Sequence, residues 1–144
     1  MFRFLCIAWV SILLVAACQK DESKPGTPFD GRDLVIAGRY SEAILALEHD
    51  LERDPRSPRA SRAWLFLGKA HLALGNLEDA ESAFRSAVRE FPSSLEAHKS
   101  QYKLALIALI RGDREAARRG FEALAQSPDG PLAAEATAMA RHLE

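Results

Sequence analysis

The four histidines of this chain are the side chains best suited to metal or acid–base chemistry. Each falls on a different expected helix, without the H-x₃-H spacing of a zinc site: His49, His71, His98 and His142. Glu48 and Asp50 flank His49, but neighbouring residues on a helix point to different faces. The sequence has no nucleophile elbow and no glycine-rich phosphate loop. We therefore expect no enzymatic activity, no cofactor and no metal site.

The thiol of Cys18 is a second reactive group, and it follows an apolar segment at the start of the chain. Residues 4–17 are apolar apart from Ser11, and Arg3 precedes them. This run is shorter than the roughly 20 residues that a helix needs to cross a bilayer, so it predicts a signal peptide. Residues 15–18, VAAC, resemble the bacterial lipoprotein box, in which an aliphatic residue and two small residues precede a cysteine.

The resemblance implies that residues 1–17 are a lipoprotein signal peptide and that lipidated Cys18 becomes the new N-terminus. The alternative is an ordinary secretory signal in which Cys18 is incidental. Gln19 follows the cysteine, and in enteric bacteria this implies an outer-membrane anchor facing the periplasm. Residues 18–27 are polar and contain Pro25 and Gly26, so we expect a flexible tether there and a folded domain over residues 28–144.

The charge balance of the chain argues against nucleic acid as a partner. The sequence has 19 basic and 20 acidic residues, for a formal net charge of −1. Phosphate backbones favour strongly basic proteins, so the chain has no general attraction to nucleic acid. Its 144 residues are enough for one modest domain.

A repeat of 37 residues runs through the chain after residue 37. Three columns keep this spacing: Gly38, Gly75 and Gly112; Ala43, Ala80 and Ala117; Leu47, Phe84 and Phe121. A glycine at a fixed place suits the turn between two helices, because glycine adopts positive φ easily. The repeat predicts an all-α stack of helical hairpins.

The central repeat resembles the tetratricopeptide pattern. It has these pattern residues at the required spacings: Trp64, Leu67, Gly68, Ala80, Phe84, Ala87 and Pro92, with His71 in the tyrosine position. The resemblance implies an all-α tetratricopeptide solenoid of about three repeats with a C-terminal capping helix. The first hairpin is expected to be imperfect, because Asp30 stands where the pattern has leucine.

Start and stop signals give approximate helix bounds. We expect helices over 28–37, 58–74, 77–90, 95–110, 114–126 and 131–143, with the second helix of the first hairpin between the first two. Ser57 and Pro58 predict one helix start, and Ser94 predicts another. The apolar character of 102–109 predicts an interior helix. The last helix has an apolar stripe opposite Glu135 and His142, as expected of a cap.

The proline and serine pattern after the second helix of each hairpin resembles a periplasmic subgroup of these repeats. It occurs at residues 54–57, DPRS, and 91–94, FPSS. The chain is similar to the C-terminal repeat domain of the Tol–Pal accessory, or cell-division coordinator, family. It is also similar to the lipoprotein of the outer-membrane β-barrel assembly machine.

In this fold the first helix of each hairpin lines a concave face, which the resemblance implies as a peptide-binding surface. The candidate residues are Arg62, Lys69, Lys99, Tyr102, Lys103 and Leu106. Lys99 and Lys103 match two basic positions of the carboxylate-clamp subgroup, whereas Leu65 and Lys69 depart from its other two. The alternative is that these cations are solvated and that their stems cover apolar neighbours.

The sequence thus predicts a lipid-anchored scaffold that binds protein partners of the bacterial cell envelope. Its membrane contact would be through the lipid anchor, with no nucleic acid or small-molecule substrate. One alternative is a structural subunit that associates with itself and binds no peptide. Another is an enzyme or small-ligand carrier, which is disfavoured because stacks of this kind usually act through surface recognition.

Overall fold

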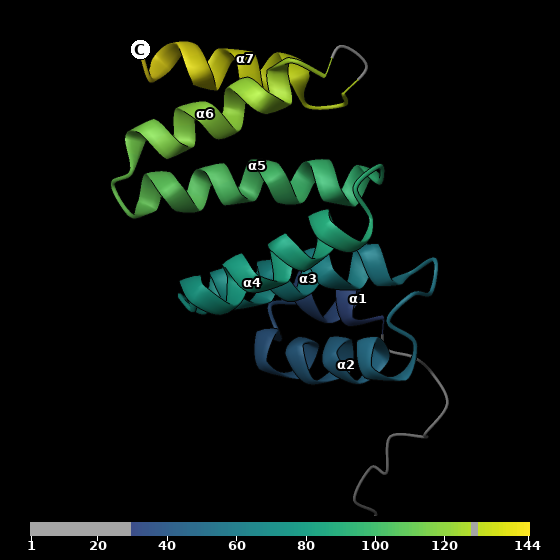
Figure 1. The fold of residues 1–144 in the computed structure, drawn as a ribbon. Helices are drawn as coiled ribbons and strands as arrows, with labels where there is room; N and C mark the ends of the chain where they lie inside the picture. Colours follow the sequence, from purple (N-terminus) through teal and green to yellow (C-terminus); the bar gives the residue numbers. More distant parts are fainter. Residues whose placement is uncertain (1–29, 128–129) are drawn as a thin grey trace, which may run out of the picture.

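A computed structural model describes residues 30–127 and 130–144, and all regular secondary structure in them is helical (Figure 1). The predicted signal peptide, Cys18 and the tether lie outside the described residues. Seven helices follow one another in this described part of the chain: α1 Gly31–Ile36, α2 Tyr40–Arg53, α3 Ala60–Ala73, α4 Leu77–Glu90, α5 Leu95–Ile110, α6 Arg114–Ala125 and α7 Ala133–His142. None of these described helices is both long and apolar enough to span a bilayer.

The helices pack as three sequential hairpins, α1–α2, α3–α4 and α5–α6, with α7 packed against α6. Figure 1 shows them as one continuous stack. The turn glycines Gly38, Gly75 and Gly112 have φ of +76°, +80° and +80°, a region that side chains with a Cβ avoid. The predicted tetratricopeptide-type solenoid, with three hairpins and a final helix, is therefore confirmed.

The first two hairpins close by the same contact between a small residue and a large one. A Cβ added to Gly68 would lie 2.5 Å from the Phe84 ring, so the absence of a side chain lets α3 approach α4. Gly31 stands in the same relation to Leu47, 37 residues earlier. The first hairpin thus keeps this contact although it departs from the repeat pattern at Asp30.

In the third hairpin, the glycine that allows close packing is on the second helix instead of the first. Ala105 occupies the position equivalent to Gly68, and its Cβ would lie 3.0 Å from a Cβ added to Gly120 on α6. Gly120 therefore provides the space that a glycine on the first helix provides elsewhere. Phe121 beside it is fully buried, as is Phe84 in the second hairpin.

Three predicted helix starts differ from the structure. The helix expected from Pro28 begins at Gly31, where the Asp30 side chain accepts from the Arg32 N–H. The helix expected from Pro58 begins at Ala60, since Ser57 to Ala60 forms a turn in which the Ala60 N–H donates to the Ser57 carbonyl at 2.9 Å. Proline is well placed in the second position of such a turn. The helix expected from Pro131 begins at Ala133, and the remaining predicted bounds agree within one residue.

The start of α5 confirms the predicted cap. Ser94 Oγ accepts from the Ala97 N–H at 3.0 Å, and α5 runs from Leu95 to Ile110. Along its length only these two end residues are exposed, so α5 is the interior helix that its apolar sequence predicts. It separates the first two hairpins from α6 and α7 (Figure 1).

The first helices of the hairpins form the inner side of the stack. Helix α3 packs against both α1 and α5, whereas α2, α4 and α6 make no comparable contacts with one another over the described residues. Helices on the inner side of a curved stack lie closer together than those on the outer side. We call the side lined by α1, α3 and α5 the concave face, and the side lined by α2, α4 and α6 the convex face.

The core consists of clusters of buried residues that follow one another along the stack. One cluster fills the space between α1 and α4, a second joins α3 and α4 to α5 through Phe84 and Ile107, and a third lies between α5 and α7. In α7 the buried residues are Ala136 and Ala140. Glu135 and His142 are exposed. Helix α7 therefore closes the stack with a polar side outward, as predicted.

Candidate functional site

Three lysines come together on the concave face: Lys69 on α3, and Lys99 and Lys103 on α5. They are the only lysines among the described residues. The pKa of Lys69 is lowered, first by burial and then by the positive charges of Lys103 and Lys99. The structure therefore brings together three of the four cations that the sequence singles out. We call Lys69, Lys99 and Lys103 the lysine cluster.

Lys69 is held above an aromatic ring rather than beside an acid. Its Nζ lies 4.6 Å from the centroid of the Phe66 ring, within the range of a cation–π interaction. The side chain is half-buried. None of the three lysines forms an ion pair or hydrogen bond with another residue in the described part of the chain. The cluster is thus a local excess of positive charge.

Arg62 lies on the same face of α3 but has a partner. Its Nε lies 3.8 Å from Oε1 of Glu96 on α5, and the Arg62 side chain remains about half exposed. An ion pair of this kind contributes roughly 0–1 kcal/mol to stability, so Arg62 can still exchange Glu96 for another anion. Arg62 is therefore a secondary member of the site.

Tyr102 and Leu106 are half-buried on α5, the same helix as Lys99 and Lys103. Both pack against the cluster between α5 and α7, and the Tyr102 ring meets the buried Phe121 ring edge-on with centroids 5.2 Å apart. Much of their surface therefore serves the core. The most exposed apolar residue of this helix is Ile110, which is 60% exposed.

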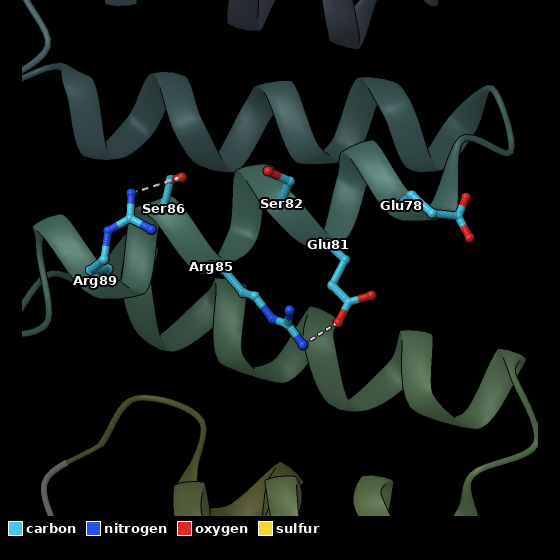
Figure 2. A pocket seen from close by; sticks show the side chains of 6 residues that line it. All are labelled: Glu78, Glu81, Ser82, Arg85, Ser86 and Arg89. Atoms are coloured by element: carbon cyan, nitrogen blue, oxygen red, sulfur yellow. Dashed lines mark hydrogen bonds and ion pairs between the residues drawn. The ribbon is translucent and has the colours of Figure 1, made fainter.

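The arginines between α4 and α5 contrast with the lysine cluster, because they are paired. Glu81 binds both Arg85, at 2.5 Å, and Arg111, and Arg111 also lies 3.3 Å from Glu78. Figure 2 shows the α4 side of this network around an open hollow of about 340 Å³. It is lined by Glu78, Glu81, Ser82, Arg85, Ser86 and Arg89. Acids accompany the cations throughout, so the hollow has no excess charge.

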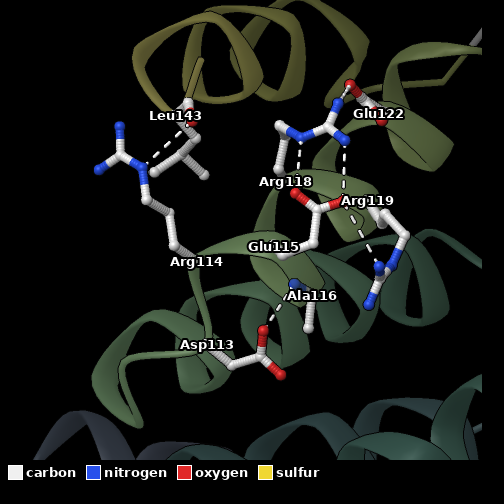
Figure 3. A network of polar contacts seen from close by, with 8 residues as sticks. All are labelled: Asp113, Arg114, Glu115, Ala116, Arg118, Arg119, Glu122 and Leu143. Carbon is white, nitrogen blue, oxygen red and sulfur yellow. Dashed lines mark hydrogen bonds and ion pairs between the residues drawn. The ribbon is translucent and has the colours of Figure 1, made fainter.

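Helix α6 has a similar paired network (Figure 3). Arg118 binds Glu115 at 2.8 Å and also Glu122, while Arg119 binds Glu115 at 3.4 Å. The hydrogen bond from Arg118 lowers the pKa of Glu115, and the hydrogen bond to Glu115 raises the pKa of Arg118. These charges balance one another along the convex face.

Arg114 at the start of α6 binds the end of the chain. Its Nε donates to the Leu143 carbonyl at 3.1 Å (Figure 3). Its Nη2 donates to the His142 carbonyl at 3.0 Å. Carbonyls at a helix C-terminus lack intrahelical donors and carry partial negative charge. Arg114 thus fixes α7 on α6 and is occupied by a structural contact.

The histidines remain apart in the structure. His71 is half-buried on α3, and its Nδ1 has no hydrogen-bond partner and lies 3.9 Å from Oδ2 of Asp79. In the described residues no group of three or more His, Cys, Asp or Glu side chains is arranged to hold a metal ion.

The chemistry that the lysine cluster offers is recognition of an anion by charge.

Sequence reasoning missed two contributors to the site. Phe66 precedes Lys69 by three residues on one helix, a spacing that brings side chains together, so this contact had a sequence signal. Glu96 pairs with Arg62 across two helices, 34 positions apart, and no local pattern predicts this contact. Which cations would be left without an acid was therefore visible only in the structure.

Comparison with known proteins agrees with the repeat architecture. Residues 31–94 match the tetratricopeptide repeat family model. No curated protein sequence matches this chain. Among solved structures, the chain is similar to PcrH in its complex with the chaperone binding region of PopD, with a TM-score of 0.65 and 24% sequence identity. The match covers 78% of this chain and 84% of PcrH. Residues 31–94 are thus similar to tetratricopeptide repeats, and the fold of the chain is similar to that of PcrH.

Proposed function

We propose that this chain is a lipid-anchored scaffold of the bacterial cell envelope that binds an acidic segment of a partner protein on its concave face. The observation that carries the proposal is the lysine cluster, which has three positive charges and no counter-ion among the described residues. A carboxylate bound there would reduce the repulsion between the lysines and accept their hydrogen bonds. The partial burial of Lys69 strengthens such an interaction relative to one in open water.

The similarity to PcrH supports a role in protein recognition. PcrH has the same fold and was crystallised with the chaperone binding region of PopD. A stack of this fold can therefore hold a segment of another protein. In this chain the half-buried Tyr102 and Leu106 next to the lysines would supply apolar contact to such a segment.

The anchor and the location rest on the N-terminal sequence. Cys18 after the small residues 15–17 supports lipidation, and Gln19 supports an outer-membrane destination facing the periplasm. Several acyl chains hold a protein stably on a membrane without a spanning helix. The partner would then belong to an envelope machine, such as outer-membrane assembly or Tol–Pal and division.

A charge-reversal experiment in cells tests the binding proposal. The variant combines Lys99→Glu with Lys103→Glu, and the matched control combines Arg85→Glu with Arg89→Glu on α4. We expect in-cell crosslinking and pull-down of partner proteins to fall at least about tenfold in the lysine variant only, because one lost charge-assisted contact is worth about 1.5–3 kcal/mol. Circular dichroism should show both variants folded. Equal loss in both, or no loss in either, contradicts the proposal.

The anchor has an independent test. Globomycin blocks cleavage of lipoprotein signal peptides, so treated cells should accumulate a longer precursor and Cys18→Ala should leave the protein unlipidated. An unchanged pattern would contradict lipidation but leave peptide binding untouched. Sedimentation of the purified domain at low concentration covers the remaining alternative, because a stable homo-oligomer would favour a self-associating structural subunit.

A further inference from the structure

The three helices that line the concave face all end on an exposed residue without a polar side chain. These are Ile36 at the end of α1, Ala73 at the end of α3 and Ile110 at the end of α5. They are 37 residues apart and so occupy the same place in successive repeats. Ile36 is 67% exposed and Ile110 is 60% exposed. We call these three residues the apolar row.

The apolar row crosses the concave face, with one residue on each of its three helices. Helix α3 packs directly on α1 and on α5, and packed helices lie about 8–10 Å apart. The row therefore offers apolar contacts at intervals of about 8–10 Å. A partner that uses all three contacts must present apolar side chains with a matching spacing.

The spacing distinguishes between partner conformations. On an α-helix, residues seven positions apart share a face and are separated by about 10.5 Å. In an extended strand, side chains on one face repeat at about 6.6 Å, and the next same-face interval is about 13 Å. The helix matches the row more closely than the strand does. A partner helix would cross α1, α3 and α5 and place one apolar residue per heptad over each.

The lysine cluster lies along one side of the apolar row. Lys69 precedes Ala73 by four residues and Lys103 precedes Ile110 by seven, which places them about 6 and 10 Å away along the helix axes. A helix with its side chains is about 10–12 Å in diameter, so it can cover the row and still reach the lysines with one flank. That flank must be acidic, because the cluster is positive.

We infer that the occupant of the concave face is an amphipathic α-helix with apolar residues repeated every seven positions and acidic residues along one flank. The inference rests on the proposed function, since it specifies the segment bound at the same site. It goes further by assigning a role to the apolar row and a conformation to the partner.

The convex face provides a matched control. Leu45 on α2 is 68% exposed, nearly the same as Ile36 in the same hairpin. The residues equivalent to Leu45 in the next two repeats are Ser82 and Arg119, both polar. Leu45 therefore stands alone, and the convex face has no row of apolar residues at this position.

Three synthetic peptides of about 21 residues, enough for three heptads, test the inference. The first has leucine every seven residues and glutamate on one flank. The second has the same composition with the leucines moved off the heptad spacing, and the third has lysine in place of glutamate. We expect fluorescence anisotropy to show binding of the first peptide alone, with a gain in helical circular dichroism on binding.

Single substitutions then locate the bound peptide. Ile36→Asp and Ile110→Asp should each weaken binding of the first peptide at least about tenfold, since each replaces an apolar side chain that the peptide would cover with a charged one. Leu45→Asp should change it less than about twofold, because an isolated exposed side chain contributes little. Thermal unfolding of each variant separates lost binding from lost folding.

Two outcomes would overturn the inference. Binding of the second peptide as tightly as the first, with no effect of Ile36→Asp or Ile110→Asp, means that an acidic segment is bound without a helical apolar face. If Lys99→Glu with Lys103→Glu still abolishes that binding, the proposed function survives. Absence of binding by any of the peptides also rejects the amphipathic helix, and the in-cell capture of partners then decides the proposed function separately.

Discussion

The concave and convex faces of this stack treat positive charge in opposite ways. On the concave face, Lys69, Lys99 and Lys103 lie near one another with no acid paired to them among the described residues. Towards the convex face, Arg85 and Arg118 are each held by glutamates. Both faces belong to one stack, and the helices that carry them alternate along the sequence. The difference therefore lies in which side chains each face presents.

This contrast shows how little the overall charge says about a surface. The chain as a whole is nearly neutral, with 19 basic and 20 acidic residues. Glutamates form ion pairs with arginines of α4 and α6, so the concave face keeps an excess of positive charge. Lysine also differs from arginine in that it makes no bidentate pair with a carboxylate. An unpaired cluster within a neutral protein is a surface on which an external anion can bind.

The first way to break the contrast is to give the lysine cluster an internal counter-ion. Ala73→Glu places a carboxylate four residues after Lys69 on the exposed side of α3. We expect it to weaken binding of an acidic partner about tenfold, or about 1.4 kcal/mol, because the new carboxylate competes for the cluster. Isothermal titration measures the effect. The isosteric control Ala73→Gln isolates the charge, and equal weakening by both would argue against competition.

The second prediction removes a shared anion from the paired side. Glu81 binds Arg85 and Arg111, and its side chain is only 17% exposed. Glu81→Gln should lower the free energy of unfolding by about 1 kcal/mol, since two cations lose a partly buried partner. Urea denaturation measures this change. The comparison variant Lys103→Gln should cost less, or stabilise, because it relieves repulsion on Lys69; a larger loss there would reverse the contrast.

The third prediction uses the lowered pKa of Lys69. The pKa of Lys69 is lower in the folded chain than its ordinary value of 10.5, so between these two values the unfolded chain binds this proton more fully than the folded chain does. Stability therefore rises with pH from the lowered pKa up to 10.5, as the charge that burial and Lys103 disfavour is lost. Lys69→Met keeps the apolar stem and should not show this rise. Urea denaturation of both proteins across this interval tests the difference, and parallel curves would contradict it.

The fourth prediction is the acid-side counterpart on α6. The pKa of Glu115 is lowered by its hydrogen bond with Arg118. Its contribution to stability is therefore present above the ordinary value of 4.5 and is lost as pH falls through the lowered pKa. Glu115→Gln should flatten the stability curve slightly in this acid range. The effect is the smallest of the four, because this ion pair is exposed; a flattening near neutral pH would point to a different group.

The repeat made the architecture predictable from the sequence. Gly38, Gly75 and Gly112 stand at the turns because each needs positive φ, and the glycines therefore mark the turns directly. Helix α4 agrees with its predicted bounds, because the turn at Gly75 before it and Pro92 after it are local signals. A single sequence therefore predicts features that depend on local backbone conformation and on the periodic spacing of buried residues.

Other features depend on distant contacts and could not be predicted. The expected start of the first helix at residue 28 was wrong, because Asp30 caps α1 at Gly31. The freedom of Lys99 and the pairing of Arg62 with Glu96 are set by packing between α3 and α5. Sequence position placed these cations on one face correctly, but which of them would keep a free charge depended on neighbours in another repeat.

The closing contact of each hairpin has a consequence for exchange between repeats. In the second hairpin the small residue, Gly68, is on the first helix, whereas in the third the glycine that makes room, Gly120, is on the second helix. A chimera that paired α3 with α6 would place Gly68 opposite Gly120, and the missing side chains would leave a void between the two helices. One that paired α5 with α4 would bring Ala105 against Phe84 with no glycine to make room. The grafting unit in this protein is therefore the intact hairpin, and duplication or recombination should respect that boundary.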